Sequence, residues 1–217
     1  MWLNDPERLK RLYPPRAEVT MNPARLQASK RRYIAQYKYN DVRTLIFLFP
    51  GEQIEVLTRQ RESHKGYRLS NKMKRALLSL DLSRDRSHVL DGGILRNLLV
   101  GDERPIVLWD ILVHEGEYLI GTTYEQRYAL LKRICREPGA LESKTGREIG
   151  LKIREALWLA PLFKSGFDRR FEQALPADYL EGLMLKDPRG KLERGILPKN
   201  NMSWQVKVRK PRKDYIF

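Results

Sequence analysis

Short apolar runs recur along the chain and alternate in part with polar residues. Runs of about four to eight residues, bounded by Gly, Pro, Asn or Asp, are typical of β-strands. A Pro-Gly turn at residues 50–51 predicts that the runs on either side of it form a hairpin. The expected strands lie at residues 33–39, 44–49, 52–59, 89–95, 106–112, 157–163, 183–185 and 204–208.

Three segments carry the signals of helices instead. Ser70 is placed to cap a helix that runs to about residue 80. Thr123 and Gln126 have the spacing of a capping box, and they predict a helix to about residue 136. Residues 167–175 predict a short third helix. Many short strands with few helices are typical of an α+β fold with antiparallel sheets flanked by helices.

The charge of the chain is strongly positive. Its 217 residues include 42 Lys and Arg against 27 Asp and Glu, a formal net charge of +15. Such an excess indicates a polyanionic partner, because basic side chains release counterions when they neutralise phosphates. A generally basic protein without such a partner is the alternative. The length suits one large domain with a substantial core.

The cysteine content and the hydropathy of the chain indicate which cellular compartment it suits. Cys135 is the only cysteine, so the chain has neither an internal disulfide nor a cysteine-rich zinc site. This composition suits a reducing cytosol. No run of about 18 apolar residues predicts a membrane span, and the first residues do not resemble a signal peptide. We expect a cytoplasmic or nucleic-acid-associated protein, in a bacterial or virus-infected cell.

Four short segments in a fixed order carry the candidate chemistry. They read Lys-Tyr-Asn-Asp-Val-Arg at 38–43, Asp-Gly-Gly-Ile-Leu at 91–95, Glu-Gly-Leu-Met-Leu-Lys at 181–186 and Trp-Gln-Val-Lys-Val-Arg at 204–209. Each places a basic or acidic residue beside small or apolar residues. A buried site that handles a nucleotide phosphate needs this combination.

These segments resemble the nucleotidyltransferase motifs of the ATP-dependent polynucleotide ligase and mRNA-capping superfamily. Residues 38–43 resemble motif I, and residues 91–95 resemble motif III. Residues 181–186 closely match motif IV. Residues 108–112 and 207–209 resemble motifs IIIa and V. The resemblance covers roughly residues 30–211, nearly the whole chain.

The resemblance implies a ligase-type nucleotidyltransferase (adenylation) domain with the α+β fold. We expect residues 1–30 to form a polar arm that wraps around the outside, and residues 31–217 to form the domain itself. Relatives usually carry an oligonucleotide-binding (OB-fold) barrel after motif V. The eight residues that follow Arg209 are too few for one, so we expect no such barrel here.

Two of the motifs depart from the family pattern. Motif I has Asn40-Asp41 where Asp-Gly is usual, and motif III has Gly93 where Glu is usual. Both changes affect positions that the resemblance connects with the ribose or the metal. Neither changes the lysine of motif I.

The matched positions imply roles for individual residues. Lys38 would be the nucleophile that attacks the α-phosphate of ATP and forms a lysyl-AMP; a neutral amine is required for that attack. Glu181 and Asp91 would hold Mg²⁺ or Mn²⁺, since hard cations prefer oxygen ligands. The residues expected to bind the nucleotide are Gln36, Arg43, Arg59, Trp109, Lys186, Lys207 and Arg209. Among them, Trp109 would stack on the base and Gln36 would read its edge.

The implied function is ATP-dependent ligation of 5′-phosphate and 3′-hydroxyl ends in nicked duplex DNA or RNA, by a monomer, with DNA slightly favoured. An RNA ligase and a capping-type guanylyltransferase are alternatives within the superfamily. From another class, a non-catalytic nucleic-acid-binding protein on a ligase scaffold would explain the two departures. It would not explain why Lys38, Glu181 and Lys207 are present.

Other polar residues are expected to be peripheral. The three histidines have no spacing typical of a metal site, and we expect them at the surface or in loops. Basic residues that could follow a phosphate backbone are Arg59, Arg61, His64, Lys65, Arg68, Lys72, Lys74 and Arg75, with Lys207, Arg209, Lys210, Arg212 and Lys213 near the end.

Overall fold

The computed structural model describes residues 6–29, 32–136, 149–193, 195 and 200–211. The basic residues at 212 and 213 lie outside these ranges, as does part of the segment 144–153 that the sequence leaves without a prediction. No helix in the described part of the chain is long and apolar enough to cross a membrane.

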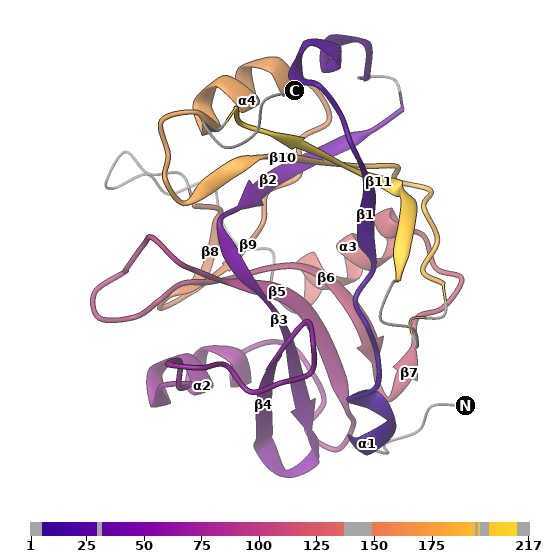
Figure 1. Ribbon diagram of the computed structural model, residues 1–217. Helices are drawn as coiled ribbons and strands as arrows, with labels where there is room; N and C mark the ends of the chain where they lie inside the picture. The colour runs from indigo at the N-terminus through magenta and orange to yellow at the C-terminus, as the bar shows by residue number, and fades with distance from the viewer. Residues whose placement is uncertain (1–5, 30–31, 137–148, 194, 196–199, 212–217) are drawn as a thin grey trace.

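Two β-sheets form the body of the protein (Figure 1). The smaller sheet has the strand order β1-β11-β10-β2, and the larger has the order β4-β3-β5-β6-β9-β8, with β7 paired to β6. Most pairs are antiparallel; β1 with β11 and β6 with β9 are parallel. The strands are β1 (Arg16–Thr20), β2 (Ile34–Tyr39), β3 (Asp41–Phe49), β4 (Gln53–Thr58), β5 (His88–Leu95), β6 (Ile106–His114), β7 (Glu117–Tyr118), β8 (Leu151–Arg154), β9 (Leu157–Leu159), β10 (Leu180–Lys186) and β11 (Asn201–Arg209).

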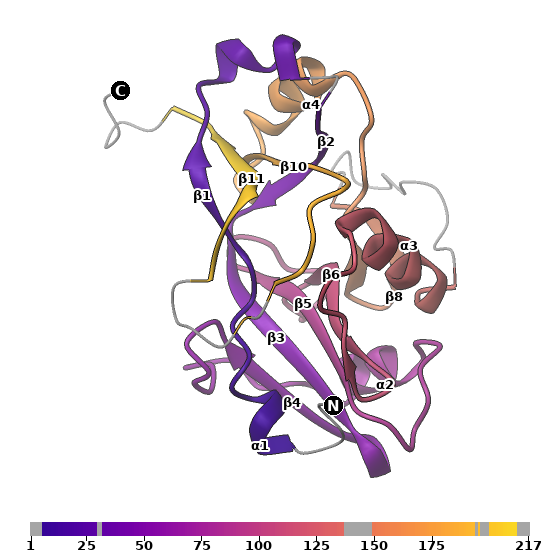
Figure 2. The same cartoon turned by 90° about the vertical axis from the view of Figure 1, so that its right-hand side faces the viewer.

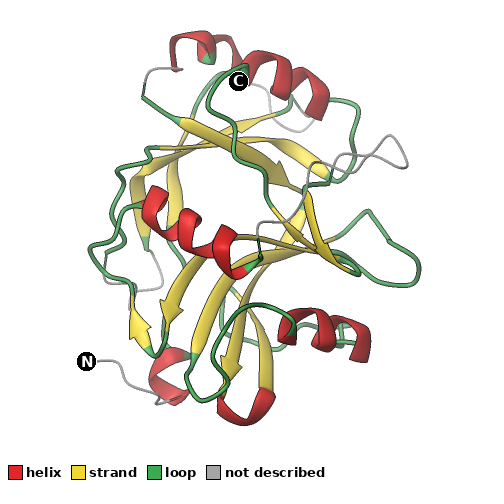
Figure 3. Ribbon diagram, turned by 180° about the vertical axis from the view of Figure 1, so that it is seen from behind, coloured by secondary structure: helices red, strands yellow, loops and turns green. Residues whose placement is uncertain are grey.

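The helices lie on the sheets, as Figures 2 and 3 show. They are α1 (Pro6–Leu9), α2 (Asn71–Leu78), α3 (Tyr124–Ile134) and α4 (Phe167–Ala174), with 3-10 turns at Pro23–Arg25, Gln27–Ser29 and Pro50–Glu52. Helix α3 contacts β6 of the larger sheet, and α4 contacts β10 of the smaller one. One apolar core lies between the larger sheet and α2 and α3. A second joins the facing sides of the two sheets to α4.

The local signals of the sequence account for most of these elements. The Ser70 hydroxyl accepts a hydrogen bond from the Met73 amide at 3.1 Å and begins α2. The predicted capping box of Thr123 and Gln126 is present at the start of α3. The expected hairpin of β3 and β4 also forms, and Gly51 adopts a φ of 75° at its turn. The sequence thus predicts those elements whose ends are fixed by neighbouring residues.

The N-terminal segment differs from the expectation of an outer arm. Residues 16–20 form β1, which pairs in parallel with β11 and extends the smaller sheet. Within β1 only Ala17 is buried. An edge strand of this kind has little apolar pattern, so sequence alone does not distinguish it from a loop. The pairing brings this segment next to the candidate motif V.

The chain passes from one sheet to the other at Asn40. Strand β2 ends at Tyr39, and β3 begins at Asp41. The Asn40 amide nitrogen Nδ2 donates to the Asp178 carbonyl at 3.2 Å, and the Asn40 carbonyl accepts from the Arg96 amide at 3.1 Å. Asn40 therefore fixes the crossing point from both sides. As a result, the motif I residues before and after it project into the space between the sheets.

Candidate active site

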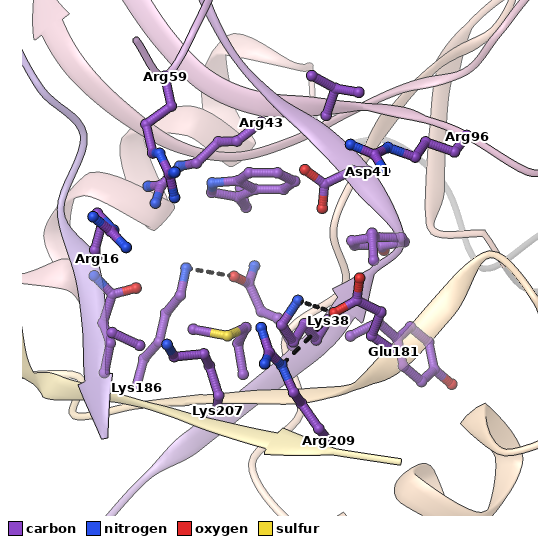
Figure 4. A pocket seen from close by; sticks show the side chains of 18 of the residues that line it. Arg16, Lys38, Asp41, Arg43, Arg59, Arg96, Glu181, Lys186, Lys207 and Arg209 are labelled. Carbon is purple, nitrogen blue, oxygen red and sulfur yellow. Dashed lines mark hydrogen bonds and ion pairs between the residues drawn. The ribbon is translucent and has the colours of Figure 1, made fainter. Parts of the chain in front are cut away.

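A cavity of about 390 Å³ lies at the junction of the two sheets (Figure 4). Its walls come mainly from β2, β3, β10 and β11, with contributions from β1 and β6. Most of its lining side chains are polar, and cations predominate. The lining residues are Arg16, Ala17, Gln36, Tyr37, Lys38, Tyr39, Asp41, Val42, Arg43, Arg59, Gln60, Arg96, Trp109, Glu181, Met184, Lys186, Gln205, Lys207 and Arg209.

Lys38 and Glu181 form an ion pair in this cavity. Both side chains are mostly covered, with 16% and 18% of their surfaces exposed. The Nε atom of Arg209 lies 3.9 Å from the same carboxylate oxygen of Glu181. The predicted nucleophile and the predicted metal ligand thus lie beside each other, although they come from strands far apart in the sequence.

A β-bulge aims Glu181 at Lys38. Leu180 pairs with Tyr39 and Gly182 pairs with Lys38, so Glu181 is the extra residue in β10. Bulges of this kind redirect side chains. Gly182 has a φ of 133°, and a Cβ atom there would collide with the Val208 carbonyl oxygen. The bulge therefore requires glycine at position 182, directly after the extra residue Glu181.

Arg43 and Asp91 form a second ion pair, across β3 and β5. Arg43 Nε donates to Asp91 Oδ1 at 2.9 Å, and its Nη2 atom donates to Oδ2. Burial acts to lower the pKa of Arg43, but the carboxylates of Asp91, Asp41 and Asp110 together outweigh it, and the net pKa is raised. Both Asp91 oxygens accept from Arg43, and Asp91 is fully buried and does not line the cavity, so Arg43 separates its carboxylate from a metal ion bound there. The metal role expected for Asp91 stays a prediction that this geometry does not support.

A buried network fixes Gln36. Its Oε1 atom accepts from Lys186 Nζ at 2.8 Å and from the Tyr124 hydroxyl at 2.7 Å. Its Nε2 atom donates to the Ala160 carbonyl at 3.3 Å. Since donors hold the oxygen and an acceptor holds the nitrogen, the amide has one orientation, and an N–H group remains for a ligand. The predicted base-reading role of Gln36 would use that N–H group.

Lys186 is nearly fully buried. Its ammonium nitrogen lies 4.1 Å from the centre of the Tyr124 ring. Burial lowers the pKa of Lys186 to about 7, although the Asp110 and Asp91 carboxylates oppose that shift. Burial also raises the pKa of Tyr124 well above its usual value, so that its hydroxyl remains a donor. Lys186 can therefore change its charge near neutral pH while it contacts the cavity.

Asp110 and Arg127 form a buried pair behind this wall, which sequence reasoning missed. Arg127 Nε donates to Asp110 Oδ1 at 2.9 Å, and Nη2 donates to Oδ2 at 3.0 Å. Arg127 also donates to the Thr122 carbonyl at 2.7 Å. The pair holds α3 against β6. The sequence did offer a signal: Asp110 stands in the middle of the apolar run 106–113. A buried charge needs a partner of opposite charge, so this position predicts a buried basic residue nearby.

Three cations gather on another wall of the cavity. They are Arg16 from β1, Arg59 just after β4, and Lys207 from β11. Burial and the nearby Arg209, Lys38, Arg16 and Arg59 lower the pKa of Lys207. Burial and then Arg16 and Arg43 lower the pKa of Arg59. Within the described ranges, none of the three has a carboxylate partner, so this wall is suited to an anion.

Trp109 provides the aromatic face at the cavity. Its ring is nearly parallel to that of Tyr39, at 12° and a centroid distance of 6.4 Å. The Arg43 guanidinium carbon lies 6.0 Å from the Trp109 centroid. Met184 also lines the cavity. An aromatic ring and a thioether in one cavity provide flat apolar surface for a base.

The expectation that all three histidines are peripheral is wrong for His88. It is fully buried, and its ring lies 5.3 Å from that of His114, next to Glu115. These three residues are close enough to suggest a metal site. However, the Glu115 amide donates to His88 Nδ1 at 3.3 Å, so the neutral ring carries its proton on Nε2, which faces the Ser83 carbonyl at 3.2 Å. A ligating Nε2 must be unprotonated. His88 is therefore a hydrogen-bonded structural residue.

The structure thus brings nine of the expected site residues to one cavity and places Asp91 behind Arg43. The cavity also contains residues without a prediction. Arg16 was missed because β1 has no recognisable strand pattern. Gln205 was missed because it has no charge; its Nε2 atom is buried without a hydrogen-bond partner among the described residues. Asp41 was noted only as a departure from motif I.

Several solved structures are similar in fold. A mycobacterial DNA ligase D in complex with ATP and MES matches with a TM-score of 0.62 and 17% sequence identity, over 92% of this chain and 60% of that one. The ligase domain of M. tuberculosis LigD matches with a TM-score of 0.59 and 18% identity, over 92% and 60%. The ATP-dependent DNA ligase of bacteriophage T7 in complex with ATP gives 0.55 and 16%, over 92% and 68%.

The comparisons by sequence gave no relative. No family model matches the chain, and no curated protein does. The chain spans 60% of the length of the two DNA ligase D chains it matches. At identities of 16–18% the likeness establishes the fold, and chemistry has to be argued from the cavity.

Proposed function

We propose that this chain, which has the confirmed α+β fold of the ligase-type nucleotidyltransferase domain, is an ATP-dependent polynucleotide ligase that works through a lysyl-AMP. The observation that carries the proposal is the ion pair of Lys38 with the bulged Glu181, in a cavity lined by cations. An amine, a carboxylate and phosphate-binding groups are the parts that nucleotidyl transfer requires. Nothing in the composition or the fold alone would select Lys38 among 42 basic residues.

In the first step, the neutral amine of Lys38 attacks the α-phosphorus of ATP. A nitrogen–phosphorus bond forms, and the bond from the α-phosphorus to the bridging oxygen breaks, so pyrophosphate leaves with the electron pair. The Lys38 ammonium first gives its proton to solvent water, and the ion pair with Glu181 opens as the amine becomes neutral. Lys207 and Arg209 project into the cavity and would stabilise the charge on the phosphoryl oxygens (Figure 4).

In the later steps, the AMP passes from Lys38 to the 5′-phosphate of a nucleic acid strand. A 3′-hydroxyl then attacks that phosphate, and AMP is released as the strand is sealed. All three steps are in-line displacements at phosphorus, so one cationic cavity can serve them. The cations Arg16, Arg59 and Lys207 provide a place for the phosphate that is not bonded to Lys38.

The donor groups of the cavity fit Mg²⁺ or Mn²⁺. Mg²⁺ usually binds through one or two carboxylates together with substrate phosphates and waters. Glu181 offers one carboxylate beside Lys38, where an α-phosphate would bind. Such an ion would neutralise charge on the phosphate oxygens. The role of Glu181 is to hold it and, without nucleotide, to hold the Lys38 ammonium.

The substrate we propose is nicked duplex DNA, bound by a monomer. The net charge of +15 supports a polyanionic partner. The long basic segment after β4 is exposed at Lys65, Arg68, Lys72, Lys74 and Arg75. These side chains are available to follow a phosphate backbone.

Incubation with α-³²P-ATP and Mg²⁺, followed by a denaturing gel, tests the proposal. We expect a labelled band at 25.6 kDa. Lys38→Ala should lose the label, whereas Lys132→Ala, which removes an exposed lysine of α3, should retain it. Labelling by α-³²P-GTP in place of ATP would indicate a capping-type enzyme. Lack of labelling by either nucleotide would leave a non-catalytic binding protein as the better account.

A further inference from the structure

Asp41 and Gly93 share one space at the cavity wall. Gly93 in β5 pairs with Arg43 in β3, and Asp41 lies two residues before Arg43 on the same face of its strand. A Cβ atom at Gly93 would lie 2.7 Å from Asp41 Cγ, and equally close to Trp109 Cη2. A real Cβ atom essentially never comes this close to an atom that is not bonded to it, so a Cβ at Gly93 would require both side chains to shift. With Asp41 and Trp109 in place, position 93 therefore has no room for a side chain.

The Asp41 carboxylate has capacity for a ligand. It lines the cavity and projects into it across from Lys38 (Figure 4). Among the residues that the structure describes, none donates a hydrogen bond to it; Lys38 and Arg43 act on it only through space. Asp41 is half-buried, and most polar groups that are withdrawn from water accept or donate hydrogen bonds. The vacant acceptor positions of Asp41 are therefore available to a bound molecule.

The place of Asp41 indicates which part of a nucleotide it would meet. Trp109 offers the flat surface for the base, and Lys38 marks the α-phosphate. The sugar connects base and phosphate, so it must lie between these two residues. Asp41 Cγ and Trp109 Cη2 both lie beside Gly93, and Asp41 faces Lys38 across the cavity. Sugar hydroxyls are donors, and a carboxylate is an acceptor.

We propose that Asp41 binds the ribose hydroxyls of the nucleotide, and that Asp41 and Gly93 are a reciprocal pair in which a carboxylate on β3 requires glycine on β5. This inference rests on the proposed nucleotide chemistry of the cavity. It gives one geometric reason for the residues at positions 41 and 93, where the family pattern usually has Gly and Glu. Here the carboxylate stands on β3 and the glycine on β5, the reverse of that pattern.

The first test measures equilibrium binding in a Lys38→Ala background, where no covalent product can form. ATP, 2′-deoxy-ATP and 3′-deoxy-ATP are titrated in turn. We expect at least one deoxynucleotide to bind about tenfold or more weakly than ATP, the factor that a hydrogen bond to a charged group contributes. Adding Asp41→Ala should bring that ratio close to one. The isosteric Asp41→Asn should give an intermediate ratio with an unchanged melting temperature.

The outcomes separate the two proposals. If ATP does not bind, the proposed function fails, and this inference fails with it. If ATP binds but both deoxynucleotides bind equally well, or if Asp41→Ala leaves the ratio unchanged, only the role of Asp41 is overturned. A change in Mg²⁺ dependence without a change in the ratio would make Asp41 a metal ligand and would also overturn it.

The second test exchanges the pair. Gly93→Glu alone should greatly reduce nucleotide binding, because the new side chain meets Asp41 and Trp109. Asp41→Gly combined with Gly93→Glu removes the contact with Asp41, and the remaining contact is with the far edge of the Trp109 ring, which has to turn slightly. This double variant should recover both binding and the preference for ATP over its deoxy forms. Melting temperatures show whether each variant folds. A folded double variant that binds no better than Gly93→Glu would contradict the reciprocal relation.

Discussion

At the scale of single residues, the cavity depends on charges held away from water. Lys186 shows this most clearly, because a buried ammonium is tolerated only when it is hydrogen-bonded or neutral. It donates to Gln36 and has the carboxylates of Asp110 and Asp91 nearby. The pKa of about 7 allows it to be neutral in part of the population at physiological pH. Binding of a phosphate would favour its charged form.

The stability of the protein should therefore reflect this lysine. The pKa of Lys186 is lowered from 10.5 to about 7 in the folded state, so between these values the unfolded chain binds more protons. Stability then rises with pH through this window. We therefore compare the melting temperature of the wild type with that of Lys186→Met at each pH. The difference, wild type minus variant, should increase by several degrees from pH 6 to pH 9. In a protein of this size, about 1 kcal/mol of stability corresponds to roughly 2–4 °C in melting temperature.

Thermal melts of both proteins across that range are the measurement, and Lys132→Met is the matched control. Lys132 is exposed on α3, and its removal should leave the pH profile of the melting temperature parallel to that of the wild type. A Lys186→Met profile that is also parallel would show that the lysine does not titrate in this window.

At the scale of elements, the geometry of the site comes from places where regular strands are interrupted. Asn40 anchors the crossing from β2 to β3, and the bulge at Glu181 turns its carboxylate toward Lys38. Both interruptions are set by short-range sequence features. The Arg43–Asp91 and Asp41–Gly93 relations depend instead on the register of β3 with β5.

At this scale, the clearest prediction concerns Gly182 in the bulge of β10. Gly182→Ala should destabilise the protein by about 1–3 kcal/mol, because the residue is held in a backbone region that disfavours side chains and its Cβ would meet the Val208 carbonyl. The label from ATP should fall as well, since the bulge would shift Glu181. Gly101→Ala is the control: it also has a positive φ, of 61°, but open space around it. Denaturant melts that show equal destabilisation for both would contradict the account.

The sequence predicts the elements and site residues that short-range signals determine. Caps and turns predict α2, α3 and the hairpin of β3 and β4. The order of the motifs predicts that Lys38, Glu181 and Lys207 share one site. The partner of Asp91 was not predictable, because it is determined by strand pairing between residues 48 positions apart. Arg16 was not predictable either, since β1 is a polar edge strand whose place depends on β11.

At the scale of the whole molecule, the positive charge is divided between the cavity and an outer surface. Arg16, Arg59 and Lys207 line the cavity, whereas the exposed cations of α2 and the loop before it face solvent. Two surfaces of this kind suit a protein that binds a nucleotide inside and a nucleic acid outside.

Binding to nicked duplex DNA should weaken steeply with salt, because each neutralised phosphate contributes a slope of about −0.9 on a log–log plot. Replacing Lys72 and Lys74 of α2 by Glu should reduce the slope by about one for each phosphate that the variant no longer neutralises. The same change at Lys132 and Arg133 on α3 is the control. Fluorescence anisotropy over a series of salt concentrations measures it, and a flat response in the wild type would contradict a backbone-binding surface.

The measurement that tests the central claim most directly is the location of the adenylate on the protein. After incubation with ATP and Mg²⁺, peptide mapping by mass spectrometry should find AMP on the peptide that contains Lys38, with fragment ions that assign it to that side chain. Adenylate on another lysine, or a label that persists in Lys38→Ala, would contradict the account of this cavity as a nucleotidyl-transfer site.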